Sequence, residues 1–230
     1  HSFGNLFLTA LEDLCGGMAK AVEEASRLLQ IKGMVLPSTL SDSHLHALLK
    51  DGTELCSEHA IDDRTESNGV PIEHVFLKPH AIAYTPAVDA ICQADIVVLG
   101  PGDLYTSILS NILIEDIGKA LRSTSAKRVL VCNLMTKPGE TDGFRLSRFL
   151  REIYRYAGSD SLDYALVNTE QVSPEVVSYY LKEGSEPVVA DLEESSNLVR
   201  NVVGLPLLAK GNLVRHDTAK LADALMGILE

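Results

Sequence analysis

Residues 95–107 read DIVVLGPGDLYTS, and this stretch decides the fold. The apolar run at 95–99 is typical of a buried strand, and two glycines and a proline then lead into an apolar helix reaching about Arg122. The alternation recurs, with strands expected at 128–132, 164–167 and 187–190 and helices at 144–156, 174–182 and 217–229. Continuous apolar strands alternating with helices predict an α/β fold with a mostly parallel sheet covered on both faces.

The residues before this stretch predict smaller elements. Helical spacing runs from about 5 to 30 and is interrupted at Gly16-Gly17, and a short buried strand is expected at 33–37. Asp-Gly at 51–52 between alternating apolar runs predicts a hairpin over 45–55. An exposed loop is expected at 62–71 and another strand at 75–77. The simplest account is one α/β domain, residues 1–230, with a β-hairpin insertion at about 36–80.

Composition excludes several classes of protein. The chain has 32 Asp and Glu against 20 Lys and Arg, a formal net charge of −12, which argues against nucleic acid or an anionic membrane surface as a partner. No apolar run approaches the ~18 residues of a membrane-spanning helix. The four cysteines form no C-x-x-C motif, and Cys92 and Cys132 lie in apolar surroundings, so we expect reduced core thiols and a cytoplasmic protein.

The turn after the first strand is the first candidate site. Glycine lets a phosphate approach the backbone, and the start of a helix offers free N–H groups and a partial positive charge. The residues that would bind phosphate are Gly100, Gly102, Thr106 and Ser107. The alternative is an ordinary strand-to-helix turn capped by a hydroxyl. No Gly-Lys-Ser/Thr follows, so this is not a Walker A motif.

The loop after the second strand should lie at the same edge of the sheet. Asn133 and Thr136 could hydrogen-bond a base or a sugar, and Glu140 and Asp142 could hold a metal ion or accept sugar hydroxyls. The alternative for Asp142 is a cap on the next helix. Asn168 ends the third strand, so three successive strands end in polar residues at one edge.

Two further groups of residues are candidates for binding a ligand or a metal ion. Arg215 precedes the last helix, where its guanidinium could clamp a diphosphate; the alternative is surface charge beside the helix cap Asp217. His44 and His46 share one face of a predicted strand, but no third ligand is indicated, so we favour an exposed hairpin over a metal site.

Seven motifs, in order along nearly the whole chain, carry a family resemblance. They are HSFGN (1–5), VLPST (35–39), ADIVVLGPGDLYTS (94–107), VCNLMTKPGETDGF (131–144), DYALVN (163–168), EGSEPVVAD (183–191) and VRHDTAKLA (214–222). Together they resemble the gluconeogenesis factor family, the CofD/YvcK-like proteins, which are relatives of 2-phospho-L-lactate transferase. GPGDLYTS is closer to the gluconeogenesis factor form than to the transferase form.

The resemblance implies a Rossmann-like three-layer fold, a nucleotide or UDP-sugar ligand such as UDP-N-acetylglucosamine, and a role in cell-wall and cell-shape control on gluconeogenic carbon sources. By the same resemblance, Asn5, Tyr180 and Arg215 become candidate ligand contacts and Thr218 a candidate phosphorylation site. We also expect a homo-oligomer, a dimer.

The chain departs from the family at several positions. A first strand with a GGGTG-type loop is missing, so we expect that residues upstream of His1 are absent. Ser57 stands where relatives often have Gly, and Asp103 where they often have Ser. Three functions stay open: a UDP-sugar-binding regulator, a phospholactyl transferase that would need Mg²⁺, and a scaffold without turnover.

Overall fold

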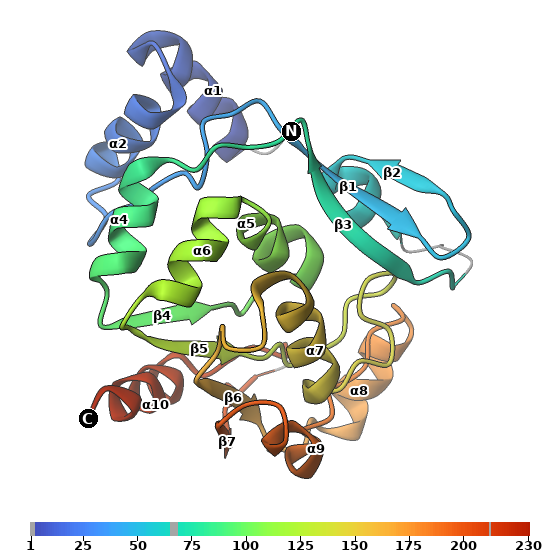
Figure 1. Ribbon diagram of the computed structural model, residues 1–230. Coiled ribbons are helices and arrows are strands. Elements are labelled where there is room, and N and C mark those ends of the chain that lie inside the picture. Colours follow the sequence, from blue (N-terminus) through green and yellow to red (C-terminus); the bar gives the residue numbers. More distant parts are fainter. Residues whose placement is uncertain (1–2, 65–68, 212) are drawn as a thin grey trace.

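The computed structural model describes residues 3–64, 69–211 and 213–230, and its centre is a four-stranded parallel sheet (Figure 1). The strands are β4 (Ile96–Leu99), β5 (Lys127–Val131), β6 (Tyr164–Asn168) and β7 (Asn201–Leu205), in that order across the sheet. β4 and β5 pair from Ile96 with Lys127 to Leu99 with Leu130, and the other pairs are parallel too. Because all four strands run the same way, their carboxyl ends meet at one edge.

Helices cover both faces of this sheet, which confirms the expected α/β architecture. Figure 1 shows most helices on one side of the sheet and α10 (Thr218–Leu229) on the other. The larger core lies on the first side, where α7 (Leu146–Ala157) buries Phe149, Leu150 and Ile153. Ile228 of α10 packs with strand residues of β5 and β6 on the opposite face. The other α-helices between Thr85 and Ser196 are α4 (Thr85–Gln93), α5 (Ser110–Ile112), α6 (Glu115–Ser123), α8 (Pro174–Leu181) and α9 (Leu192–Ser196).

A second, antiparallel sheet lies beside the first at the opposite end from α10 (Figure 1). It consists of β1 (His44–Leu49), β2 (Glu54–Cys56) and β3 (Ile72–Lys78), in the order β2-β1-β3. β1 and β2 form the hairpin predicted from Asp51-Gly52. Leu45, Ala47 and Val75 join the same buried cluster as the parallel sheet, so the insertion shares the main core. A short helix, α3 (Glu58–Asp62), follows the hairpin.

The chain begins with a pair of helices, as the sequence predicts. α1 (Phe3–Cys15) and α2 (Met18–Leu28) are separated at Gly16 and Gly17, which have φ of +76° and +143°. Leu11, Ala21 and Ala25 are the buried contacts between them.

Several expectations from the sequence are wrong. Residues 33–37 form no strand, and Met34 and Val35 are exposed. Residues 187–190 make only single bridges, Pro187 with Met135 and Val189 with Arg145, because the chain there crosses the loops that follow β5 rather than entering the sheet. The fourth strand is β7 instead. Its apolar run Val202-Val203 is interrupted by Gly204, which hid it from the sequence pattern.

Other corrections concern exposure and continuity. The helix expected to reach Arg122 is broken into a π-helical turn, η2 (Leu104–Leu109), followed by α5 and α6. Cys92 is exposed, while Cys132 is buried as expected. In the loop predicted to be exposed at 62–71, Arg64 is buried, because its guanidinium donates hydrogen bonds to the Gly139 and Val70 carbonyls. Residues 65–68 of this loop lie outside the described part of the chain.

Across the described residues, no helix combines the length and the apolar character that crossing a membrane requires.

Candidate functional site

The turn after β4 is tied directly to the loop after β5. Gly100 adopts φ of +80°, and a Cβ there would lie 2.9 Å from the Val131 carbonyl oxygen, so no other residue fits. The Gly102 N–H donates to Asn133 Oδ1 at 3.2 Å. Two loops from adjacent parallel strands therefore meet where the sequence predicts a site.

The helix that starts after this turn begins as a π-turn. The Asp103 carbonyl accepts hydrogen bonds from both Ser107 N–H (2.9 Å) and Ile108 N–H (3.0 Å). π-turns inside helices occur often at functional sites. Within this turn Thr106 is buried whereas Ser107 is exposed, and the two predicted hydroxyls line different cavities.

Ser107 faces a cavity of about 380 Å³ that we call the turn cavity. Gly100, Gly102 and Ser107 line its polar end, together with Asn111 from α5. The rest is apolar and comes from β4 and the helices packed on it: Ile91, Val97, Val98, Leu99, Ile108, Ile112, Ile117 and Leu121. Of the four predicted phosphate-binding residues, three lie together here.

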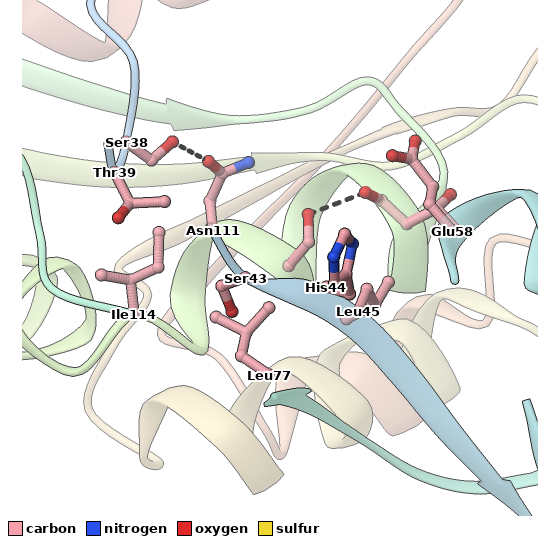
Figure 2. Close-up of a pocket in the computed structure, with 11 residues that line it drawn as sticks. Ser38, Thr39, Ser43, His44, Leu45, Glu58, Leu77, Asn111 and Ile114 are labelled. Carbon is pink, nitrogen blue, oxygen red and sulfur yellow. Dashed lines mark hydrogen bonds between the residues drawn. The ribbon is translucent and has the colours of Figure 1, made fainter. Parts of the chain in front are cut away.

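Thr106 faces a second cavity, of about 330 Å³, between the antiparallel sheet and η2. We call it the hydroxyl cavity. Figure 2 shows Ser38 and Asn111 pointing toward one another across it, with His44 and Glu58 on the side of the hairpin. Ser38 Oγ donates to Asn111 Oδ1, and Asn111 Nδ2 donates to the Ser107 carbonyl at 2.6 Å. Asn111 thus separates the two cavities.

The loop after β5 uses much of its polar chemistry to fold. Buried Thr136 accepts a hydrogen bond at Oγ1 from Glu186 N–H (3.0 Å), which holds the crossing segment 185–187. Asp142 Oδ2 accepts from Gly139 N–H (2.8 Å), so this carboxylate closes its own loop; the structure places it neither at a metal cluster nor at the helix cap. Asn168 Oδ1 accepts from Leu207 N–H (2.9 Å) and joins β6 to the chain beyond β7.

Glu140 and Lys137 are the residues of this loop that meet ionisable groups from elsewhere in the chain. One carboxylate oxygen from each of Asp62, Asp103 and Glu140 lies within 4.8 Å of the others, and we call these three residues the acidic cluster. Lys137 Nζ lies 2.6 Å from Asp62 Oδ1 and 3.5 Å from Asp103 Oδ2. Burial, and then the negative charge of Asp103, raise the pKa of Glu140 to about 7; the positive charge of Lys137, and then the Tyr105 N–H, offset this in part, although the N–H does not reach hydrogen-bond geometry.

The residues suggested by the family resemblance lie elsewhere. Tyr180 Oη accepts from Val214 N–H (3.2 Å), which ties α8 to the segment carrying Arg215, whose side chain is exposed. Tyr180 and Thr136 line one hollow of about 850 Å³ with Lys137 and Asp62. Thr218 is exposed as the first residue of α10, behind the cap Asp217. Asn5 is exposed on α1.

Sequence reasoning gave no role to His216, Lys137 or Asp62. His216 lies beside the Cys132 backbone at the end of β5, and burial lowers the pKa of its imidazole, partly offset by that backbone. Its position just before a helix cap was the only signal in the sequence. Lys137 and Asp62 are 75 residues apart, and no local pattern joins them.

Comparison with known proteins assigns the family. The family model described as "2-phospho-L-lactate transferase CofD" matches residues 1–208. The chain is 37% identical to a "Putative gluconeogenesis factor" of Aquifex aeolicus, over 100% of this chain and 70% of that protein. It is 36% identical to the "Gluconeogenesis factor" of Bacillus subtilis, over 100% of this chain and 72% of that protein.

A solved structure agrees with this assignment. The crystal structure of a UPF0052 family member from Bacillus halodurans superimposes with a TM-score of 0.92 at 34% identity, covering 98% of this chain and 72% of that one. These matches agree with the motifs around residues 94–107 and 131–144 and with the parallel sheet that carries them. The chain belongs to the gluconeogenesis factor family and carries a CofD domain over residues 1–208.

Proposed function

We propose that this chain binds a nucleotide sugar of the UDP type at the carboxyl ends of β4 and β5, and that it acts as a regulator of carbon metabolism and cell shape rather than as an enzyme. The observation that carries the proposal is the hydrogen bond between Gly102 and Asn133, which joins two loops where ligands of open α/β sheets bind. Membership of the gluconeogenesis factor family supports a regulatory role.

The turn cavity has the composition that such a ligand needs. Its apolar wall, from Val97 to Leu121, would pack against a base, and its polar end offers the Ser107 hydroxyl and the Asn111 amide to phosphate or sugar oxygens. Asn133 would act indirectly, because its amide oxygen holds the turn in place. Gly102 leaves room beside Ser107, since an added Cβ would lie 3.4 Å from Ser107 Cβ.

The same cavity favours binding over turnover. None of the described residues that line it carries an ionisable side chain. Acid–base catalysis and phosphoryl-type transfer both rely on a positioned titratable group or a metal ion. The proposal includes a cytoplasmic location, which rests on four cysteines without a disulfide-type spacing.

Calorimetric titration of UDP-N-acetylglucosamine tests this function. Wild type should bind, and Gly102→Val should abolish binding with the fold intact, because the new side chain fills the space beside Ser107. Gly227→Val is the matched control, since a Cβ at Gly227 meets nothing within 4 Å. Equal affinities in wild type and Gly102→Val would exclude the turn cavity as the site.

A phospholactyl transferase is the second candidate, and the family model that matches residues 1–208 favours it. The protein would be incubated with Mg²⁺, a deazaflavin acceptor and an activated phospholactyl nucleotide. Formation of the phospholactyl product would replace the regulatory proposal by an enzymatic one.

A further inference from the structure

We infer that the acidic cluster of Asp62, Asp103 and Glu140 is a binding site for one divalent cation that prefers oxygen ligands, such as Mn²⁺, Ca²⁺ or Mg²⁺. This inference concerns different side chains from those of the turn cavity and does not rest on the proposed nucleotide binding. The spacing of the carboxylates suits such an ion. Oxygen ligands on opposite sides of Mg²⁺ or Ca²⁺ are about 4–5 Å apart, and the cluster's oxygens lie within 4.8 Å of one another.

Glu140 supplies the observation that separates this cluster from an ordinary acidic surface. The residue is only 4% exposed, and within the described part of the chain both of its carboxylate oxygens are buried without a hydrogen-bond partner. A buried carboxylate is costly unless it is paired or coordinates a metal. Glu140 faces Asp62 and Asp103, so the group that would satisfy it must be shared with two further carboxylates.

Lys137 does not fill this role. Its ammonium forms an ion pair with Asp62 and a long hydrogen bond to Asp103, the two outer members of the cluster, but it donates no hydrogen bond to Glu140. It also engages a single oxygen of each aspartate, Oδ1 of Asp62 and Oδ2 of Asp103. The other oxygen of each aspartate and both oxygens of Glu140 are not engaged by Lys137.

The charge around the cluster matches a divalent cation. Asp142 adds a fourth carboxylate in the same loop, and the neighbouring cations are Lys137 and Arg64, whose guanidinium donates to the Gly139 carbonyl at 2.8 Å. When all four carboxylates are ionised, these two cations leave two negative charges. In a chain of net charge −12, no long-range field compensates them.

An ion can reach the cluster from one side. The Asp62 and Asp103 side chains are 43% and 36% exposed, whereas Glu140 is buried beneath them. Solvent therefore meets two carboxylates first and the unpartnered one last. Carboxylate ligands with access to water suit Mg²⁺, Ca²⁺ and Mn²⁺ rather than softer metals.

Titration of the full chain with Mn²⁺, with free Mn²⁺ counted by electron paramagnetic resonance and without nucleotide, tests the site. We expect one saturable site from which Ca²⁺ or Mg²⁺ displaces Mn²⁺. Glu140→Gln keeps the shape of the side chain and should weaken Mn²⁺ binding at least about tenfold, the lower end of what loss of even an outer ligand costs. Asp142→Asn is the matched control: it removes the same charge from the same loop but no proposed ligand, and it should stay near wild type.

Two results would overturn the inference. One is the absence of saturable Mn²⁺ binding to folded wild-type protein, which would leave Lys137 and Arg64 to balance the charge of the cluster. The other is an equal loss in Glu140→Gln and Asp142→Asn, which would mean that the ion senses only the general field. If Glu140→Gln fails to fold, Asp103→Asn replaces it, because the Asp103 side chain is more exposed than that of Glu140. Its Mn²⁺ affinity is then compared with that of Asp142→Asn.

Discussion

Arg128 and Asp163 form a two-pronged ion pair just before the first paired residues of β5 and β6, Val129 and Tyr164. Arg128 Nε donates to Asp163 Oδ2 and Nη2 to Oδ1, both at 2.9 Å, and the Arg128 backbone N–H also donates to Oδ2 at 2.9 Å. Paired geometry of this kind is stronger than a single contact. It fixes the amino ends of two strands whose carboxyl ends carry the turn and the loop of the candidate site.

This pair makes stability depend on pH. The Arg128 side chain, ahead of any other cause, lowers the pKa of Asp163 below its ordinary value. A carboxyl group with a lowered folded pKa stabilises the native state above its unfolded pKa, and that stability is lost as pH falls through the folded pKa. Wild type should therefore exceed Asp163→Asn in unfolding free energy by about 1.5–3 kcal/mol at pH 7, with the gap shrinking below about pH 4.

Urea unfolding of both proteins from pH 7 to pH 3 measures this gap. The control is Asp89→Asn, an exposed carboxylate of α4 with no ion pair recorded in the described residues. A gap between wild type and Asp163→Asn that does not change with pH would contradict the ionic explanation and leave only lost packing.

Gly100 should be irreplaceable for two separable reasons. Its φ of +80° disfavours any side chain, and a Cβ would also approach the Val131 carbonyl at 2.9 Å. Gly16 has φ of +76° but open space around it, so Gly16→Ala isolates the cost of the backbone conformation, about 1–2 kcal/mol. Gly100→Ala should cost more than Gly16→Ala in chemical denaturation. Equal losses would show that the approach to Val131 relaxes freely.

Asn133 is predicted to act by holding the turn rather than by touching the ligand. Asn133→Ala removes the acceptor of the Gly102 N–H. We expect a stability loss of about 0.5–1.5 kcal/mol, as for other single hydrogen bonds, together with weaker UDP-N-acetylglucosamine binding. Asn133→Asp keeps an acceptor and should restore stability but not affinity, because a carboxylate beside the turn repels phosphate. Calorimetry and thermal unfolding on both variants separate the two effects.

The parts of this structure that local pattern determines were predictable, and those made by distant residues were not. Strands β4, β5 and β6, the β1–β2 hairpin and the cap Asp217 follow from apolar runs, an Asp-Gly turn and helix capping, and all are present. β7 was missed because Gly204 interrupts a short apolar run that alone resembles a loop. The segment 187–190 has a strand-like sequence, yet its neighbours are loops.

The candidate site divides in the same way. Gly100, Gly102 and Ser107 come from one motif and lie together, whereas Thr106 faces the other cavity, because consecutive residues of a helix point in different directions. The acidic cluster joins the end of α3 to two loops from the parallel sheet. Tertiary folding alone brings those three carboxylates together.

Arg215 is predicted to bind the phosphates of the ligand. It does not line the turn cavity, but the next residue, His216, lies beside the Cys132 backbone at the carboxyl end of β5. The Arg215 side chain is exposed, and the described residues provide it with no ion-pair partner, while its segment is held by Tyr180 and by Asp217 at the start of α10. A guanidinium held in this way can clamp two phosphate oxygens, which Lys cannot copy. Arg215→Ala should weaken UDP-N-acetylglucosamine binding by about 1.5–3 kcal/mol without lowering stability, and Arg215→Lys should recover only part. Calorimetry on wild type and both variants measures this, with Lys210→Ala, a nearby loop cation, as the control. Identical dissociation constants in wild type and Arg215→Ala would remove Arg215 from the ligand site.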